Sequence, residues 1–384
     1  MRFKGFTDDW KQRKLGEIIT EYKKTVDSDC TLPILTSSKT EGVILQEEHF
    51  GRKQQHDITG YNILPRNYCT YRNRSDGVDF TFNINKCCDK GIISKFYPVF
   101  SGKNSDVFFL SLVLNNSDEV VREIAYTCTG TGQKVLSFLD LQKMKVRVPS
   151  FDEQKEIATY FDSLDHLITL HQQKLTLLTK LKKAMLEKMF PKKGSVIPEI
   201  RFNGFANAWE QRKLGDVCEV TMGQSPDGST YSDEPSDYIL VQGNADLKDG
   251  WVVPRVWTSQ KTKTAQAGDL IMRVRAPVGA MGKTAYDIVI GRGVAAIKGN
   301  EFIYQTLVKY DADGYWKKLA AGSTFESVNS NEVKGAIINV PQDIEEQKKI
   351  GEYFLNLDHL ITLHQRKLDM LKKLKSACLS EMFI

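Results

Sequence analysis

The sequence has no long apolar run and no cysteine pair at metal-binding spacing. No stretch of the 384 residues approaches the roughly eighteen apolar residues of a membrane helix, and the opening MRFKGFTDDW lacks the apolar core of a signal peptide. Seven cysteines, an odd number with no C-x-x-C among them, argue against a disulfide framework and against a cysteine zinc site. We therefore expect a protein that remains in a reducing cytoplasm, away from membranes, and holds no metal itself.

Catalytic motifs are missing as well. The chain has no G-x-S-x-G, no N/D-P-P-Y/F methyltransferase motif and no glycine-rich AdoMet loop. PVGAMGKT at 277–284 approaches a Walker A loop, but a proline replaces its first glycine and the strand-like AYDIVIG follows. Pro226-Asp227 with Asp246 and Lys248 resembles the spacing of a PD-(D/E)xK nuclease, whose carboxylates hold Mg²⁺, although the first half of the chain has no counterpart. The absences favour a binding protein, with such a nuclease as an alternative.

One nine-residue string is written twice. LDHLITLHQ occupies 164–172 and again 357–365. The same offset of 193 residues aligns 161–190 with 354–383, and 20 of the 30 positions are identical. The repeated unit is therefore a long element and not a short motif.

A second repeat lies upstream of the first. RFKGFTDDWKQRKLG at 2–16 returns as RFNGFANAWEQRKLG at 201–215, with 10 of 15 positions identical. Between these anchors, 19–130 and 218–320 show no persuasive alignment. A period of about 195 residues is the size of a domain, so the pattern predicts two homologous domains and not a solenoid.

The repeated element near the end of each half predicts a long helix. Apolar residues recur at alternating spacings of four and three, which is typical of a coiled-coil seam. The runs follow Pro149 and Pro341, and acids gather at their starts and lysines at their ends, as the helix dipole favours. About 38 residues at about 1.5 Å per residue give a rod of roughly 57 Å. The seam positions, expected to pack the two helices on each other or on a partner subunit, are Ile157, Phe161, Leu164, Ile168, His171, Leu175, Leu178, Ile350, Phe354, Leu357, Ile361, His364, Leu368 and Leu371.

The histidines of the string are interpreted as seam residues. His166 and His171 are five apart and do not converge on one helix face as a zinc-binding pair would. His171 and His364 are expected to fix the register of the helices, as a buried polar residue does in other coiled coils. Further apolar positions flank the seam and leave surface for another protein; these are Leu167, Leu170, Leu177, Leu181, Leu360, Leu363, Met370 and Leu374.

The middle segments differ in character from the helices. Residues 19–148 and 218–340 carry short apolar runs broken by Gly, Pro, Asn and Asp, which predict strands and tight loops, with a short helix near 301–311. The net charge of +5 permits a polyanionic partner. Basic and aromatic residues in these loops are ordinary solvated surface or, since there is a cluster in each half, a bipartite DNA site. The candidate DNA contacts are Arg66, Tyr71, Arg72, Arg74, Lys95 and Lys103 in the first half, and Arg255, Lys261, Lys263, Arg273, Arg275, Lys283 and Arg292, with Trp257 nearby, in the second.

The layout resembles a known family. The RFxGFxxxWxQRKLG opening, the variable middle, the VP…EQKxI entry into a long helix and the repetition of all three are similar to the specificity subunit of Type I restriction–modification systems. The segments 91–100 and 268–297 also resemble stretches of that family's target recognition domains, and Gln154 and Gln347 fall in its helix-entry motif.

This resemblance implies a bacterial, cytoplasmic, non-catalytic DNA-recognition subunit with an α+β fold. It implies two target recognition domains separated by two long antiparallel helices, each domain reading one half of an asymmetric, split double-stranded DNA sequence. It implies two modification subunits and two restriction subunits as partners; AdoMet, ATP and Mg²⁺ would be bound by those partners and no cofactor by this chain. The rival interpretation is a scaffold whose helices join two ligand-binding domains without DNA. The expected segments are 1–148 and 193–340 for the recognition domains, and 149–192 and 341–384 for the spacer helices.

Overall fold

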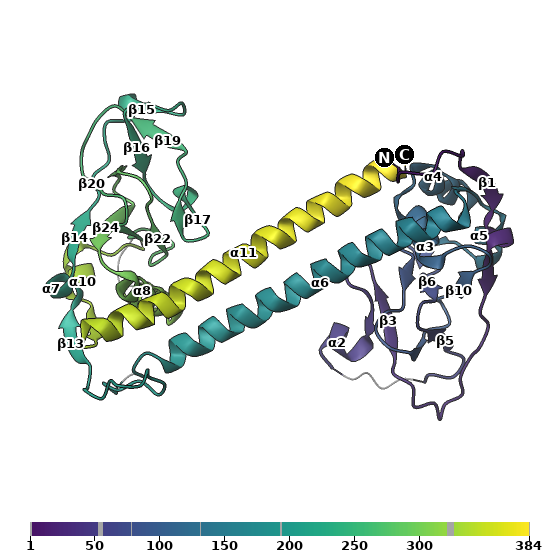
Figure 1. Cartoon of the computed structure of the whole chain (residues 1–384), viewed down its shortest axis with the longest axis horizontal. Coiled ribbons are helices and arrows are strands. Elements are labelled where there is room, and N and C mark those ends of the chain that lie inside the picture. The colour runs from purple at the N-terminus through teal and green to yellow at the C-terminus, as the bar shows by residue number, and fades with distance from the viewer. Residues whose placement is uncertain are drawn as a thin grey trace. The chain divides into compact units, whose positions relative to one another are not determined.

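The chain forms two compact units in the computed structural model. Unit 1 comprises Met1–Leu170 and Leu368–Ile384, and unit 2 comprises His171–Lys367. Each unit contains a domain of strands and short helices together with the beginning of one long helix and the end of the other (Figure 1). The α+β class and the two long helices are as predicted. The structure describes residues 2–52, 57–77, 79–130, 132–192, 194–320 and 326–383.

The domain of unit 1 has a four-stranded sheet in the order β2-β10-β6-β8, accompanied by two-stranded ladders. Helix α3 carries the sequence VFFLSLVLNN, whose apolar side chains form the core beneath that sheet. The elements are β1 (Lys11–Lys14), α1 (Leu15–Ile18), β2 (Ile19–Glu21), β3 (Leu35–Ser38), β4 (Gly42–Leu45), α2 (Gln46–Phe50), β5 (Asn62–Pro65), β6 (Cys69–Thr70), β7 (Arg74–Ser75), β8 (Asn83–Ile84), β9 (Lys90–Ile93), β10 (Val99–Gly102), α3 (Val107–Asn116), α4 (Asp118–Thr127), β11 (Lys134–Val135), α5 (Phe138–Lys143) and β12 (Lys145–Val148).

Two larger sheets form the domain of unit 2, a six-stranded one in the order β14-β24-β21-β22-β18-β17 and a five-stranded one in the order β15-β19-β16-β23-β20. Strand β21 is buried along its whole length and packs in the core. The elements are β13 (Glu210–Lys213), α7 (Leu214–Val217), β14 (Glu219–Met222), η1 (Gly228–Thr230), β15 (Tyr231–Ser232), β16 (Tyr238–Val241), η2 (Asn244–Asp246), β17 (Leu247–Lys248), β18 (Trp251–Val252), β19 (Val256–Thr258), β20 (Thr264–Ala265), β21 (Leu270–Arg273), β22 (Met281–Lys283), β23 (Ile288–Ile290), β24 (Val294–Lys298), α8 (Glu301–Ala312), α9 (Tyr315–Ala320), α10 (Ser330–Gly335) and β25 (Ile337–Val340).

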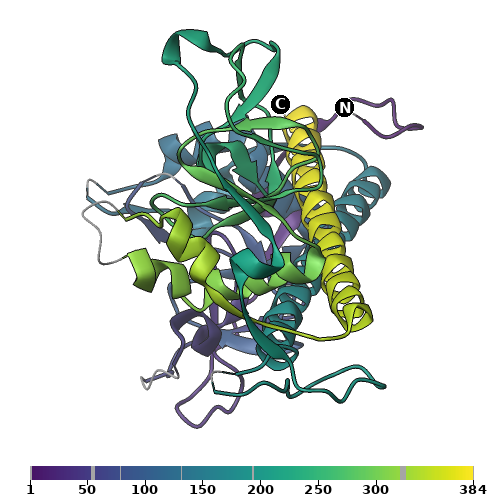
Figure 2. The same cartoon turned by 90° about the vertical axis from the view of Figure 1, so that its left-hand side faces the viewer.

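The long helices are α6 (Phe151–Lys188) and α11 (Ile344–Met382). Within unit 1, Asp165 of α6 meets Lys375 of α11, and earlier on α6 Phe161 lies against Phe383, just beyond the end of α11. Within unit 2, contacts run the same way, from the His171–His364 pair to Lys182 with Asp358. In both units the residue numbers of the contacts on α11 decrease as those on α6 increase, so the two helices are antiparallel within each unit. Figure 2 turns unit 2 toward the viewer and shows α11, in yellow, beside the green elements of that unit.

The repeated opening segment is joined to the start of each long helix by a short ladder. Strand β1 pairs antiparallel with β12, directly before α6, and β13 pairs antiparallel with β25, directly before α11. Trp10 packs on Phe109 in unit 1, and Trp209 packs on Phe302 in unit 2. The repeated opening segment of each half therefore meets the strand that leads into its long helix, and the two ends close the domain.

No helix in the described ranges is both long enough and apolar enough to cross a membrane.

Candidate nucleic-acid interface

Most candidate contacts of unit 1 lie on exposed loops. Arg72, Arg74, Lys95 and Lys103 are exposed. The guanidinium of Arg74 lies 4.6 Å from the ring centre of Phe96, and the ammonium of Lys95 lies 5.8 Å from the same ring. Two cations therefore share one exposed aromatic ring, an arrangement that can bind a phosphate while the ring packs on a base or sugar.

Two of the candidate residues in unit 1 are already engaged. The Arg66 side chain donates to Asp89 at 2.7 Å and to the carbonyl of Lys86 at 2.9 Å, although it stays exposed. Tyr71 is fully buried, and its hydroxyl donates to the carbonyl of Leu136 at 3.1 Å. Burial raises the pKa of Tyr71 strongly, because the phenolate would lose its hydration. The sequence placed Tyr71 among the DNA contacts because aromatic and basic residues alternate there; the structure places it in the core, where it cannot reach a ligand.

The candidate contacts of unit 2 gather where several loops meet. The backbone N–H of Ile290 donates to the carbonyl of Lys263, and the N–H of Gln224 donates to the carbonyl of Ile290. The N–H of Arg292 donates to Ser225 Oγ at 3.1 Å. These bonds hold the loops that carry Lys263 and Arg292 together. Five candidates of this unit are exposed: Arg255, Lys261, Lys263, Arg275 and Arg292.

Two candidates of unit 2 point inward. Arg273 is 5% exposed, and its guanidinium donates to the carbonyl of Ala276 at 2.5 Å. Burial lowers the pKa of Arg273, and the charge of Asp311 opposes that shift. Lys283 forms an ion pair with Glu301, and its ammonium lies 4.2 Å from the ring centre of Tyr304. The prediction that Arg273 and Lys283 contact DNA does not fit these positions, because both sit on strands of the six-stranded sheet whose side chains turn into the domain.

The charge pattern also missed residues that the fold brings to the same places. Gln224 and Gln242 lie on two further loops beside those that carry Lys263 and Arg292. The N–H of Gln224 donates to the carbonyl of Ile290, and Val241, next to Gln242, accepts the N–H of Gly291. Glutamine can pair with the edge of adenine through two hydrogen bonds, so its position near cations fits base reading. Net charge cannot find such residues. A search for amides in glycine-bounded loops would have found them.

The predicted seam residues line the contacts between the helices. Every one of them is buried or half-buried, and the core clusters of the two units include Phe161 with Leu164 and Phe354 with Leu357. The residues that flank the seam are between 36% and 60% exposed: Leu167, Leu170, Leu177, Leu181, Leu360, Leu363, Met370 and Leu374. The members of this outer apolar set are related in pairs by the same offset of 193 residues. Unit 1 carries four of these exposed apolar side chains and unit 2 the other four, and exposed apolar side chains of this kind are suited to contact with a protein partner.

Neither of the two near-matches to catalytic motifs has the required geometry. Asp246 is buried; its Oδ2 accepts the N–H groups of Gln242 and Gly243, and its Oδ1 accepts from Arg255 Nε at 3.3 Å. Its carboxylate therefore closes a turn and has no free oxygen to hold a metal ion. Residues 281–283 of the Walker-like stretch form strand β22, whereas a P-loop leads into a helix. Within the described ranges, no group of three His, Cys, Asp or Glu side chains could hold a metal ion.

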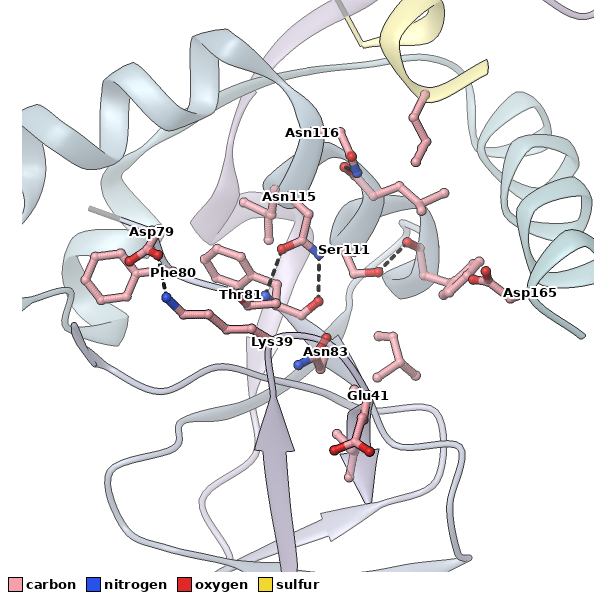
Figure 3. Close-up of a pocket in the computed structure, with 18 of the residues that line it drawn as sticks. Lys39, Glu41, Asp79, Phe80, Thr81, Asn83, Ser111, Asn115, Asn116 and Asp165 are labelled. Carbon is pink, nitrogen blue, oxygen red and sulfur yellow. Dashed lines mark hydrogen bonds and ion pairs between the residues drawn. The ribbon is translucent and has the colours of Figure 1, made fainter. Parts of the chain in front are cut away.

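A pocket of about 660 Å³ opens in unit 1 between β8, α3 and the end of α11 (Figure 3). The amide of Asn115 holds its wall by accepting the N–H of Phe82 at 2.9 Å and donating to the carbonyl of the same residue at 2.8 Å. Lys39 pairs with Asp79 at its rim. The described lining contains none of the candidate contacts, and its polar groups serve mainly to fasten its own walls.

The sequence family fits this duplicated architecture. The family described as "Type I restriction modification DNA specificity domain" matches residues 7–180 and again residues 206–373. The two matches cover most of the chain, so the chain belongs to this family and carries its domain twice. The prediction of two homologous domains is confirmed.

Two relatives and one solved structure share this organisation. The putative type I restriction enzyme MjaX specificity subunit of Methanocaldococcus jannaschii is 29% identical over 261 residues, which are 63% of this chain and 59% of that protein. The type I restriction enzyme MjaVIII specificity subunit of the same organism is 22% identical over 315 residues, 74% of this chain and 72% of that protein. A Type-I restriction-modification system S subunit from M. genitalium superposes with a TM-score of 0.66 at 12% identity, over 100% of this chain and 97% of that one, and shows the same fold.

Proposed function

We propose that this chain is the DNA-specificity subunit of a Type I restriction–modification complex and reads a bipartite, asymmetric target. The observation that carries the proposal is the twofold match to the specificity-domain family, in which each match includes a domain with exposed cations on clustered loops. Each recognition domain reads one half-site. The variable middles share little sequence, so the half-sites differ and the whole target is not palindromic.

Reading follows from the side chains available. Exposed Arg and Lys neutralise phosphates and supply salt-dependent affinity. Arg292 with Gln224 and Gln242 in unit 2, and Arg72 with Arg74 in unit 1, are the side chains suited to base edges in the major groove. The predicted contacts Arg66, Lys95, Lys103, Arg255, Lys261, Lys263 and Arg275 serve the phosphates.

The partners are inferred from the outer apolar set on the long helices. We propose that two modification subunits dock on this set and that two restriction subunits join the complex. Methylation, cleavage and ATP use belong to those subunits, which bind AdoMet, ATP and Mg²⁺. The chain itself reads DNA and has no catalytic role. The segments 149–192 and 341–384 act as the spacer between the recognition domains 1–148 and 193–340.

The experiment is DNA binding at a series of salt concentrations. Methylome sequencing of a strain that carries the gene first identifies the target. Binding of the complex with its modification subunits to that duplex is then measured by fluorescence anisotropy. Lys95→Ala and Lys263→Ala, both in the set that serves the phosphates, should each weaken binding and lower the salt slope by about one. Arg122→Ala, which removes an exposed cation of α4 outside the candidate set, is the control.

The outcome separates the reader from the scaffold. If binding shows no salt dependence and no preference for the target sequence over other duplexes, the chain is a scaffold and the proposal is wrong. A complex that binds its target with equal slopes in all three variants would keep the function but remove these two lysines from the interface.

A further inference from the structure

The aspartate of the repeated string forms the centre of a line of polar side-chain contacts in unit 2. Asp358 uses both carboxylate oxygens: Oδ1 accepts from Lys182 Nζ of α6 at 2.6 Å, and Oδ2 accepts from Gln305 Nε2 of α8 at 2.8 Å. Gln305 is fully buried. One side chain of α11 is therefore bound at the same time by the other long helix and by the recognition domain.

The chain of polar contacts continues into the sheet. Gln305 Nε2 also donates to Glu301 Oε1 at 2.9 Å, and Glu301 Oε2 holds the ammonium of Lys283 on β22. The side chains of the two ion pairs are between 12% and 29% exposed. Two cations and two anions balance, so the line of contacts from β22 to α6 is neutral. Partly buried charges of this kind are stable only when each has its partner, which makes the line sensitive to the loss of any member.

Unit 1 holds its helices with the same ion pair but ties its domain differently. Asp165, the counterpart of Asp358, accepts from Lys375 at 2.5 Å. Phe109 of α3 and Phe302 of α8 pack on the equivalent residues Trp10 and Trp209, and three residues further on unit 1 has Leu112 where unit 2 has Gln305. Leu112 has no polar group to offer. Instead Lys86, from a variable loop, pairs with Asp162 of α6. Each recognition domain is thus tied to a long helix by a polar contact: in unit 2 the hydrogen bond goes to the aspartate of the string, and in unit 1 it goes to Asp162.

We propose, on the basis of the proposed function, that the Gln305–Asp358 contact is a positioning element which fixes the orientation of the second recognition domain on the helices. It makes the complex selective for the number of base pairs between the half-sites. The packing of α8 on α11 supports this role. The helix is packed on α11 by Phe302 and Phe354 of one core cluster, and apolar packing alone permits small rotations, whereas a buried hydrogen bond to a carboxylate has one direction.

The test uses Gln305→Leu, which places in unit 2 the residue that unit 1 has at this position. Methylation rates of the complex are measured on duplexes with the natural spacer and with one base pair added or removed. Gln305→Leu removes the hydrogen bonds to both Glu301 and Asp358. Loss of the one to Asp358 should lower discrimination against the wrong spacers by about tenfold, as expected for one hydrogen bond to a charged group. Half-site preference and the rate on the natural duplex should stay close to the parent. Lys283→Met breaks the same line at its outer end and should act in the same direction.

Asp165→Ala is the matched control, because it removes an equivalent ion pair between the helices without touching Gln305 or its partners. The complex with Asp165→Ala should discriminate between spacers as the parent complex does. If Gln305→Leu and Lys283→Met both discriminate as the parent does in active complexes, the positioning role is refuted while the proposed function stands. If the parent complex shows no sequence-specific methylation at all, the proposed function fails, and the positioning role fails with it.

Discussion

The two units share their joints and differ in almost everything between them. Arg2 binds Glu153 through two hydrogen bonds of 2.8 Å in unit 1, and Arg201 binds Glu346 through bonds of 2.6 and 2.8 Å in unit 2. The glutamine that follows each glutamate donates to the carbonyl of the proline before the helix, at 3.0 Å and 3.1 Å. Yet one domain is built on a four-stranded sheet and the other on sheets of six and five strands. The repeated letters encode attachment, and the unrepeated letters encode what each domain can recognise.

The largest expected effect comes from replacing one unrepeated segment. Exchange of residues 19–148 for the corresponding segment of another family member should replace one half of the methylated motif and leave the other half as it was, because the joint between Arg2 and Glu153 lies outside the exchanged segment and the incoming segment supplies its own partner for β1. Methylome sequencing measures both halves at once. A change in both halves would show that the two domains do not read independently.

A second prediction changes the helices and keeps both domains. Insertion of one heptad after Leu175 and another after Leu368 keeps the seam in phase and lengthens each helix by about 10.5 Å. Since DNA rises about 3.4 Å per base pair, the preferred spacer should grow by roughly three base pairs, less any bending of the DNA. Methylation mapping gives the new spacer. An unchanged spacer in an active complex would mean that these helices do not set the gap, and altered half-sites would mean that they help to read bases.

A third prediction compares the two joints directly. Glu346→Ala should lower the free energy of unfolding by about 2 kcal/mol, because it leaves the guanidinium of Arg201 without its partner and that side chain is only 13% exposed. Glu153→Ala should cost less, because the side chain of Arg2 is 31% exposed and can turn to water. Urea unfolding, with hydrogen exchange at β13 and β1 to assign the loss to a unit, measures both. Equal losses in the two variants would show that the exposure of the stranded arginine does not determine the loss of stability.

Periodicity carried most of what the sequence could predict. The 4-3 spacing located both long helices to within a few residues and identified a seam whose residues are buried or half-buried. Composition predicted exposed loops for Arg72 and Arg292, but it could not tell them from Tyr71 and Arg273. These two lie inside because of strand pairing between distant segments, which leaves no local pattern.

The line of polar contacts through Asp358 could not be predicted from the sequence either. Four of its five residues, Lys182, Asp358, Gln305 and Glu301, lie on α6, α11 and α8, which are far apart in sequence. Gln305 has no counterpart in the other half that would have marked it. A duplicated chain reveals its attachments by repetition. Contacts that exist in one unit only must be found in the structure.

The smallest expected effect concerns the histidine pair of the string. Nδ1 of His171 and Nδ1 of His364 are 2.8 Å apart, so one ring donates and the other must be an unprotonated acceptor. Burial lowers the pKa of His364, and the charges of His171, Lys174 and Lys367 lower it further. The unfolded chain, with a histidine pKa of about 6.5, then binds more protons than the folded one, and its advantage grows as pH falls through that value. The pair's contribution is present above about pH 6.5 and is lost below it.

Thermal unfolding between pH 7.5 and pH 5.5 tests this contribution. The Tm of the parent should fall by about 2–4 °C more over that range than the Tm of His364→Asn, which keeps a polar seam residue that cannot titrate. His166→Asn with His359→Asn is the matched control, because both of these residues are exposed and belong to the same string, and it should follow the parent. Identical pH profiles for the parent and His364→Asn would mean that the pair accepts a second proton at no cost. The rings would then have to separate in solution, and the register of the helices would rest on the apolar seam alone.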